Sequence, residues 1–336
     1  MKAKSPNQLA LVLRDFFGEF LPGVRNVSPH TIASYRDSLV LLLRFVAAQQ
    51  RRCVSLLDFK DVSAELILRF LNDLENERHN TATTRNVRLS AIHAFFRYVA
   101  AQHPDRLEHC QRVLVIPFKR ARQRTIEYLE YEEIQNVLSA VDHSTCDGRR
   151  DYALLATLFN TGARVQEILD LRACDVQLTK PFQVRLFGKG RKERFCPLWP
   201  QTARLLRSFF KERLLEPHSQ QQVFLNHRGE PLTRFGVRYL LKKYQDLAKV
   251  HVASLRAKKL HPHSLRHSTA VALLKAGVDL STISQWLGHA SSNTTNKYAT
   301  IDLEMKRAAI AKVKPIRGQR RNVWRSRSVL EWLEGL

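Results

Sequence analysis

The chain has 336 residues, 44% of them hydrophobic, and its 55 Lys and Arg against 31 Asp and Glu give a formal net charge of +24. This length favours two domains, and the hydrophobic content excludes wholesale disorder. So large a positive excess indicates a polyanionic partner, most often nucleic acid, because binding releases counterions condensed on the phosphates. A basic solvated surface, as in a ribosomal-type protein, is the alternative.

The first hundred residues predict a compact bundle of helices, because apolar residues recur at helical spacing between turn signals. Ser28 and Pro29 form a typical helix start, with a capping side chain followed by proline in the first turn. Val87 is expected on the buried face of the last of these helices. The expected helices are Gln8 to Leu21, His30 to Gln49, Val62 to Arg78 and Thr81 to Ala101.

A basic, proline-containing connector follows, at 113–125. Basic side chains in the fourth helix and in this connector could face phosphate groups, although each alone is typical of a solvated surface. The candidates for such contacts are Arg85, Arg88, Lys119, Arg120, Arg122 and Arg124.

Beyond about Ile126 the pattern predicts a second, mainly helical domain with a small antiparallel sheet. Alternating runs at 182–187 and 193–198 flank a glycine-rich turn, which indicates a β-hairpin, and Val176 could add a third strand. Helices are expected to start near Leu129 and to cover 151–160, 163–171, 202–215, 233–251 and 264–276.

Five scattered cysteines without a CxxC pair indicate neither a disulfide framework nor a zinc knuckle. Charged residues interrupt the N-terminal segment, and no apolar run is long enough to span a bilayer. These features predict an intracellular protein with no membrane association.

His263 and Arg266 lie three residues apart and so share one helix face, where the arginine could bind phosphate oxygens with its planar fork of donors. His263 and His267 form an i,i+4 pair that could bind zinc, but the motif lacks the glutamate of HExxH and a nearby third ligand. No metal is therefore expected, and a structural role for a single histidine remains the alternative.

Arg164 follows a glycine turn at a helix start, and Glu167 could orient its guanidinium. Lys189 lies at the tip of the hairpin, beside Arg191 and Lys192, which are further candidates for DNA contact. Tyr298 follows a polar segment, and its phenol would need a base and nearby cations to act as a nucleophile. Each motif alone is weak, since solvated arginines, charged turns and stacked tyrosines are common.

Together, five motifs in a fixed order resemble the tyrosine recombinase (phage integrase) family, in the style of Xer-type and transposon-encoded members. They are TGARVQEIL, GKGRKER, HPHSLRH, LGH and the tyrosine of NKYAT. The resemblance implies a helical core-binding, DNA-binding domain at 1–112, a linker at 113–125, a catalytic domain at 126–313 and a basic tail at 314–336. Ala163 stands where leucine is frequent in the family, which concerns packing only.

The resemblance also implies the residue roles. Arg164 and Arg266 would hold the scissile phosphate, Tyr298 would be the nucleophile, and Glu167 would support Arg164. The division of acid and base labour among Lys189, His263 and His289 stays open. The reaction would pass through a 3′-phosphotyrosyl bond and a Holliday junction, with no cofactor, ATP or metal.

The partners implied are double-stranded DNA and further subunits: a homotetramer or mixed tetramer on two DNA sites, with a possible partner recombinase. The amphipathic segment Leu303 to Val313 would be a helix exchanged between subunits. Such a protein would work in the cytoplasm, on the nucleoid. The alternatives are a non-catalytic DNA-binding or architectural protein and a type IB topoisomerase.

Overall fold

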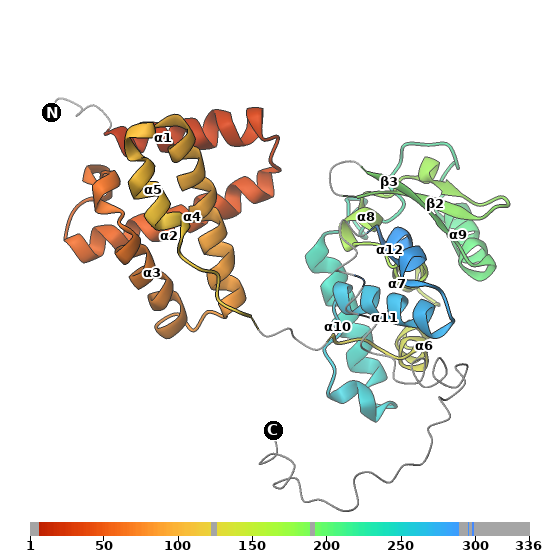
Figure 1. Cartoon of the computed structure of the whole chain (residues 1–336). Helices are drawn as coiled ribbons and strands as arrows, with labels where there is room; N and C mark the ends of the chain where they lie inside the picture. The colour runs from red at the N-terminus through yellow and green to blue at the C-terminus, as the bar shows by residue number, and fades with distance from the viewer. Residues whose placement is uncertain (1–6, 122–125, 189–191, 289–294, 296–297, 299–336) are drawn as a thin grey trace, which may run out of the picture. The chain divides into compact units, whose positions relative to one another are not determined.

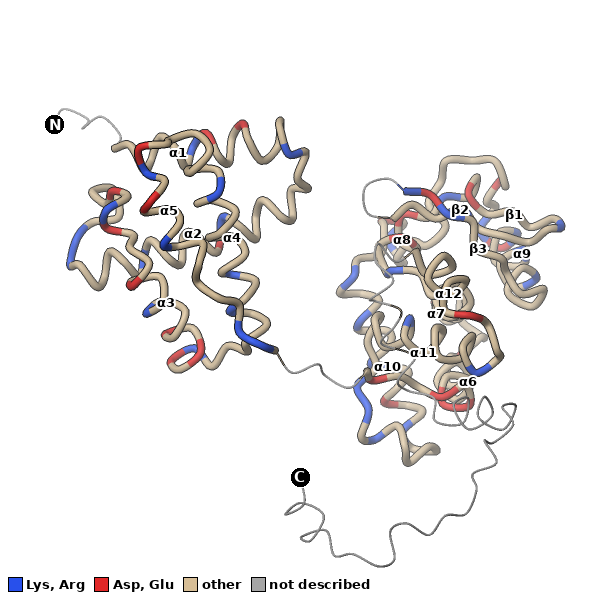
Figure 2. The backbone as a smooth tube through the Cα atoms, in the orientation of Figure 1, with Lys and Arg blue, Asp and Glu red and all other residues tan. Residues whose placement is uncertain are grey.

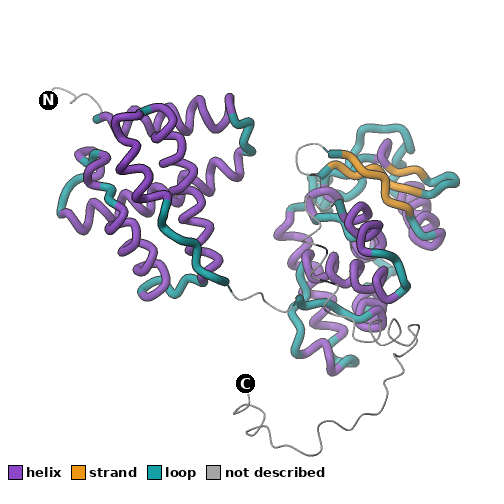
Figure 3. Tube along the Cα trace, in the orientation of Figure 1, coloured by secondary structure: helices purple, strands orange, loops and turns teal. Residues whose placement is uncertain are grey.

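The computed structural model describes residues 7–121, 126–188 and 192–288, together with Thr295 and Tyr298. Its backbone contacts divide the chain into two compact units, residues 1–124 and 125–336. Both are mainly helical, and the second carries a small sheet (Figures 1 and 3). The predicted fold class is confirmed. In the described part of the chain, no helix is both long enough and apolar enough to cross a membrane.

The N-terminal unit is a helical bundle with a core of buried aliphatic and aromatic side chains (Figure 1). Ser28 caps the second long helix as predicted, its hydroxyl accepting a hydrogen bond from the Thr31 amide, an interaction that contributes about 1 kcal/mol in typical helices. The main helices are α1 (Gln8–Asp15), the π-helix η1 (Phe16–Val24), α2 (Pro29–Gln50), α3 (Ala64–Asn76), α4 (Ala82–Gln102) and α5 (Leu107–Leu114).

Three features of this unit differ from the sequence prediction. The first helical segment does not stop at Pro22 but continues through it as η1. Val87 is exposed rather than buried. Val113, in the last turn of α5, and Ile116, just after that helix, are fully or almost fully buried in the bundle core, so these connector residues pack as part of the N-terminal unit.

Two histidines, the buried His93 and the partly buried His109, should make this bundle sensitive to acid. Burial lowers the pKa of His93, assisted by the charge of Arg97, and burial is also the main cause that lowers the pKa of His109. Both histidines regain a pKa near 6.5 on unfolding, so below about pH 6.5 the unfolded chain binds more protons than the folded one. The free energy of unfolding therefore falls as the pH falls through this window.

We expect the urea midpoint, followed by circular dichroism of the full chain, to drop between about pH 7.5 and pH 5.5. The double variant His93→Leu/His109→Leu should show a smaller drop over the same range. An equal drop in the double variant would assign the acid sensitivity to other groups.

The second unit contains a three-stranded antiparallel sheet in the order β1-β2-β3, with Phe187 opposite Glu193 next to the hairpin tip. The predicted hairpin and the third strand at Val176 are confirmed. The strands are β1 (Val176–Gln177), β2 (Gln183–Phe187) and β3 (Glu193–Pro197). The main helices are α6 (Tyr131–Ser139), α7 (Cys146–Thr161), α8 (Val165–Leu169), α9 (Pro200–Glu212), α10 (Arg234–Ala248), α11 (Pro262–Lys275) and α12 (Leu280–Leu287).

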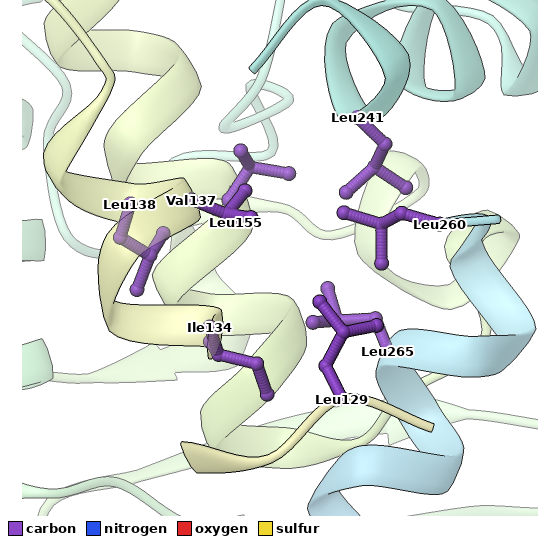
Figure 4. A pocket seen from close by; sticks show the side chains of 8 residues that line it. All are labelled: Leu129, Ile134, Val137, Leu138, Leu155, Leu241, Leu260 and Leu265. Atoms are coloured by element: carbon purple, nitrogen blue, oxygen red, sulfur yellow. The ribbon is translucent and has the colours of Figure 1, made fainter. Parts of the chain in front are cut away.

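The helices pack around two apolar clusters. The larger one includes much of α7, which contacts α9 and α11, and the smaller one lies between α11 and α12 and includes Tyr298. The larger cluster contains a gap of about 10 Å³. Figure 4 shows the aliphatic side chains that line it, such as Ile134, Leu241 and Leu265. A space of this size with only apolar lining is a packing gap and not a substrate site. The two clusters together hold the ends of α7, α11 and α12 in fixed positions.

Candidate active site

The turn after α7 is fixed by Gly162, which ends the helix with a positive φ of 57°. A side chain here would be strained and would also collide with its surroundings, since an added Cβ would lie 2.5 Å from Leu287 Cδ2. The glycine thus permits α7 to end directly against α12. The chain leaves this turn through Ala163 and places Arg164 at the start of α8.

Arg164 is held by a carboxylate and by a backbone carbonyl. Its Nη1 lies 2.8 Å from Glu167 Oε1, and its Nη2 donates to the carbonyl oxygen of Gly288 at 3.2 Å. The guanidinium side chain keeps 36% of its surface exposed. The predicted contact between Glu167 and Arg164 is therefore present, and Arg164 remains accessible to a ligand.

Arg266 lies on α11 and is only 5% exposed. Its Nη1 donates to the Gly162 carbonyl at 2.7 Å and its Nη2 to the Leu287 carbonyl at 2.6 Å. Burial, together with the charge of Arg164, lowers the pKa of Arg266 to about 10, so the guanidinium stays protonated at neutral pH. Arg164 and Arg266 thus bond to consecutive carbonyls at the end of α12.

His261 and His263 stand at the start of α11. His261 caps the helix, since its Nδ1 accepts from the Ser264 amide at 3.0 Å. His263 lies in the first turn at the accessible edge of the site. Partial desolvation lowers the pKa of His263, with the charges of His261, Arg266 and Arg164 as further causes, so the ring is neutral near pH 7. A neutral imidazole can accept a proton or donate one hydrogen bond.

Tyr298 is 1% exposed and packs among apolar residues of α11 and α12, such as Leu274 and Ile283. Its hydroxyl lies 2.6 Å from Nδ1 of His267, and the tautomer of the ring decides which atom donates. Burial raises the pKa of Tyr298 to about 12, although the charge of Arg266 acts in the opposite direction. In this position the phenol is a neutral and weak nucleophile.

The sequence does not predict the contact between His267 and Tyr298, since its pattern presents His267 only as a possible zinc ligand beside His263. Among the residues that the structure describes, no group of three or more His, Cys, Asp or Glu side chains is arranged to hold a metal ion. The helical spacing of His267 indicates that it faces other residues of the unit rather than open solvent. Nothing in the sequence, however, pairs it with Tyr298, which follows a polar segment 31 residues later.

Several predicted residues fall outside the described part of the chain: Arg122, Arg124, Lys189, Arg191 and His289. The exchanged helix expected at 303–313 and the basic tail also lie there. The neighbouring framework is described, since β2 and β3 lead to and from the loop with Lys189, and α12 ends at Leu287, two residues before His289.

Arg85 is a correction among the predicted DNA contacts. It is only 2% exposed, donates to the Pro117 carbonyl at 3.1 Å and lies 3.7 Å from Glu75, so its charge serves the N-terminal core. Arg88 is half-buried and donates to Ser38 Oγ at 3.0 Å. Lys119 is half-exposed but paired with Glu75 at 2.6 Å.

Arg120 and Lys192 are exposed and stay available as contacts with DNA.

The start of α10 adds a candidate contact region that the sequence did not indicate, and lysines and arginines lie along this helix in Figure 2. Phe235 and Tyr239 are 82% and 67% exposed there, one helical turn apart. Arg234 of the same turn donates to Gln166 of α8 at 2.7 Å, which places this surface beside the turn with Arg164.

Comparison with known proteins identifies the family of the chain. Residues 127–305 match the phage integrase family and residues 15–103 match its N-terminal SAM-like domain. The y4rC protein of Sinorhizobium fredii, assigned to the integrases and recombinases, is 42% identical over 311 residues, which is 93% of each chain. Tyrosine recombinase XerC of Oceanobacillus iheyensis is 30% identical over 315 residues, covering 92% of this chain and 97% of that protein.

Solved structures give the same result. The XerH recombinase in a pre-cleavage complex with its difH substrate superposes with a TM-score of 0.65 at 25% identity, over 86% of this chain and 81% of that one. A lambda integrase tetramer bound to a Holliday junction shares the fold, with a TM-score of 0.63 at 18% identity, over 88% and 78% of the two chains. The resemblance drawn from the five motifs is confirmed, and the chain belongs to the phage integrase family of tyrosine recombinases.

Proposed function

We propose that this recombinase cuts and rejoins DNA through a covalent bond between Tyr298 and a 3′ phosphate. The observation that carries the proposal is the convergence of Arg164 and Arg266 on consecutive carbonyls, those of Gly288 and Leu287. Two guanidinium groups at one helix end, with the tyrosine packed against the same helix, suit a phosphodiester whose negative charge must be neutralised during attack.

In the proposed reaction the Tyr298 oxygen attacks the phosphorus in line and the 5′ oxygen of the next nucleotide leaves. Arg164 and Arg266 stabilise the charge that develops on the non-bridging oxygens, and Glu167 holds Arg164 in orientation. His263, neutral at pH 7, and His289 share proton transfer and orientation of the phosphate. One ester replaces another, so the bond energy is conserved and the reaction needs neither ATP nor a metal.

The described position of Tyr298 is a resting position in this scheme. The phenol is buried, its pKa is raised by that burial, and His267 accepts or donates its hydrogen bond. Attack requires the hydroxyl to leave this contact and reach the phosphate held by Arg164 and Arg266. Binding of DNA would favour such a shift, because Tyr298 can contact the phosphate in the exposed position but not in the buried one.

Lys189 is the candidate for protonating the leaving 5′ oxygen, since glycines flank it in the hairpin tip. We expect Lys189→Ala to slow cleavage of an ordinary phosphodiester by about 100-fold or more. A substrate with a 5′ thiol leaving group needs no proton, so the variant should cleave it nearly as fast as the wild type does. If the variant were equally slow on both substrates, Lys189 would not be the general acid, and that role would be assigned to His263 or His289.

We further propose that the subunits act as a homotetramer or mixed tetramer on two double-stranded DNA sites, with strand exchange through a Holliday junction. Support comes from the related lambda integrase tetramer bound to such a junction. A partner recombinase and an exchanged helix at 303–313 belong to this proposal, as does transposition, which a structural neighbour from the transposon Tn1549 favours at the level of fold. The site of action would be the nucleoid in the cytoplasm.

The proposed division of labour assigns residues 1–112 to core binding of DNA, 113–125 to the linker, 126–313 to catalysis and 314–336 to a basic tail. The burial of Val113 and Ile116 in the N-terminal core favours a connector that begins after Ile116. Arg120, Lys192 and the exposed start of α10 are the described candidates for contact with the duplex, because they combine accessible positive charge with aromatic surface.

The test is a recombination assay on a duplex recovered from a random-sequence library by binding to the full chain. Two plasmids that each carry this duplex should exchange flanking segments when incubated with the protein. Relaxation of a single supercoiled plasmid without exchange would favour the topoisomerase, and binding without any strand cleavage would favour the architectural protein.

A further inference from the structure

Arg194 of β3 is the last residue of the GKGRKER motif, but none of the roles assigned to the site residues and no step of the proposed mechanism uses it. Its side chain is 11% exposed, so its charge lies inside the catalytic unit. Its Nη2 bonds to Glu167 Oε2 at 2.6 Å, and its Nε donates to the carbonyl oxygen of Trp286 at 3.0 Å. One guanidinium therefore connects the hairpin strand, the start of α8 and the end of α12.

Glu167 is shared between two arginines. Its Oε1 faces Arg164 Nη1 at 2.8 Å, while its Oε2 accepts from Arg194 Nη2 at 2.6 Å and from the Arg164 amide at 2.9 Å. Burial alone would raise the pKa of Glu167, but the hydrogen bond and charge of Arg194 and the hydrogen bonds of Arg164 outweigh it and lower that pKa. The carboxylate is thus ionised and placed to neutralise whichever arginine it bonds.

This sharing determines how much of the positive charge of Arg164 can act on a phosphate. With Arg194 present, the carboxylate of Glu167 is neutralised by two arginines, so the exposed side of Arg164 stays positive. Without Arg194, the negative charge of Glu167 would fall on Arg164 alone and reduce the attraction for a phosphate oxygen. Arg194 itself is too deeply buried to contact DNA, so any effect must pass through Glu167 and Arg164.

Arg194 also packs against the backbone that holds both arginines. Gly288 ends α12 with a φ of 63°, and a Cβ there would lie 3.0 Å from Arg194 Nη1. Because the Leu287 and Gly288 carbonyls accept from Arg266 and Arg164, the position of this turn sets both guanidinium groups. β3 begins right after the loop that contains Lys189, so the same contact ties the hairpin to this turn.

We propose that Arg194 is a positioning residue for strand cleavage: it shares the charge of Glu167 so that Arg164 stays cationic toward the phosphate, and it fixes the hairpin against the end of α12. This inference rests on the proposed function. The alternative is an ion pair that only stabilises the fold. Arg185 of β2 illustrates this role: its side chain is 40% exposed and bonds to the buried Asp175 at 2.8 and 3.0 Å.

The experiment compares Arg194→Met, Arg194→Lys and the matched control Arg185→Met on the duplex recovered from the random-sequence library. Each duplex carries a nick beside the cleavage position, and the rate of covalent adduct formation is measured in a single turnover. A second set of duplexes has a neutral methylphosphonate at that position, which removes the charge on a non-bridging oxygen. Affinity for the duplex and the melting temperature are measured in parallel.

We expect Arg194→Met to slow cleavage of the phosphodiester by about 10- to 100-fold, while affinity for the duplex changes by less than about 3-fold. Arg194→Lys should recover part of the rate, since it keeps the charge but cannot reach both Glu167 and Trp286. On the methylphosphonate the deficit of Arg194→Met should shrink to about 3-fold or less, because less negative charge has to be stabilised. Arg185→Met should match the wild type on both duplexes.

The inference is overturned if Arg194→Met cleaves as fast as Arg185→Met, or if its deficit is equal on both linkages and follows the melting temperature. Should Arg194→Met fail to fold, the same comparison of linkages in Arg194→Lys decides the matter. A wild-type chain that forms no adduct contradicts the proposed function itself, and the inference with it. An adduct that forms in the wild type and is insensitive to Arg194 leaves the proposed function standing and removes only this inference.

Discussion

Arg266→Met should lower the single-turnover rate of strand cleavage by about 1000-fold or more, the largest effect expected of any substitution outside the nucleophile. The reason is that Arg266 is a fixed cation: it is 5% exposed and held by the Gly162 and Leu287 carbonyls. A preorganised donor of this kind needs no rearrangement when charge develops on the phosphate. Methionine fills similar volume but offers no charge and no donor.

The matched control for this variant is Arg213→Met. Arg213 is half-buried and donates to the Val223 carbonyl at 2.6 Å, so its loss also leaves a carbonyl without a guanidinium donor. We expect Arg213→Met to lower the melting temperature without changing the cleavage rate per folded molecule. If both variants lost the same fraction of activity, Arg266 would be a structural residue and the arginine pair would lose its assigned role.

Gly162→Ala should destabilise the catalytic unit by about 3 kcal/mol or more, through a combination of backbone strain and collision. The φ of 57° disfavours any side chain, and the new Cβ would approach Leu287 Cδ2 to 2.5 Å and Thr269 Cγ2 to 3.1 Å. Because Leu287 and Gly162 both accept hydrogen bonds from Arg266, relief of the clash should also displace that guanidinium. The measurement is urea unfolding together with the cleavage rate.

Gly229→Ala separates the two causes. Gly229 has a φ of 77° but nothing within 4 Å of an added Cβ, so it carries the strain without the collision. We expect it to cost only about 1 kcal/mol and to leave cleavage unchanged. Equal losses of stability in the two variants would mean that the contact between the α7 turn and α12 is loose, contrary to the packing described above.

Periodicity and turn chemistry predicted most of the fold. The capping role of Ser28, the need for glycine at position 162 and the hairpin around Lys189 each depend on a few neighbouring residues, which a sequence displays directly. The short helix α5 was missed because only Cys110 and Val113 face the core, too few positions to establish a period. Val87 was misassigned because α4 has apolar residues on more than one side.

The site was predictable as a set of residues but not as a geometry. The motifs identified Arg164, Arg266 and Tyr298, yet their convergence on the end of α12 depends on contacts between segments far apart in the chain. The burial of Arg85, the contact of His267 with Tyr298 and the charge sharing of Arg194 have the same origin. A charged side chain looks alike in sequence whether it faces water, DNA or a buried carboxylate.

The most direct test of the central claim is covalent capture on a nicked duplex. Wild type and Tyr298→Phe are incubated with the duplex recovered from the library, and the protein that remains attached to DNA after denaturation is digested and analysed by mass spectrometry. We expect an adduct in the wild type alone, with the nucleotide on the peptide that contains Tyr298. An adduct of equal yield in Tyr298→Phe, or attachment at another residue, would contradict the account.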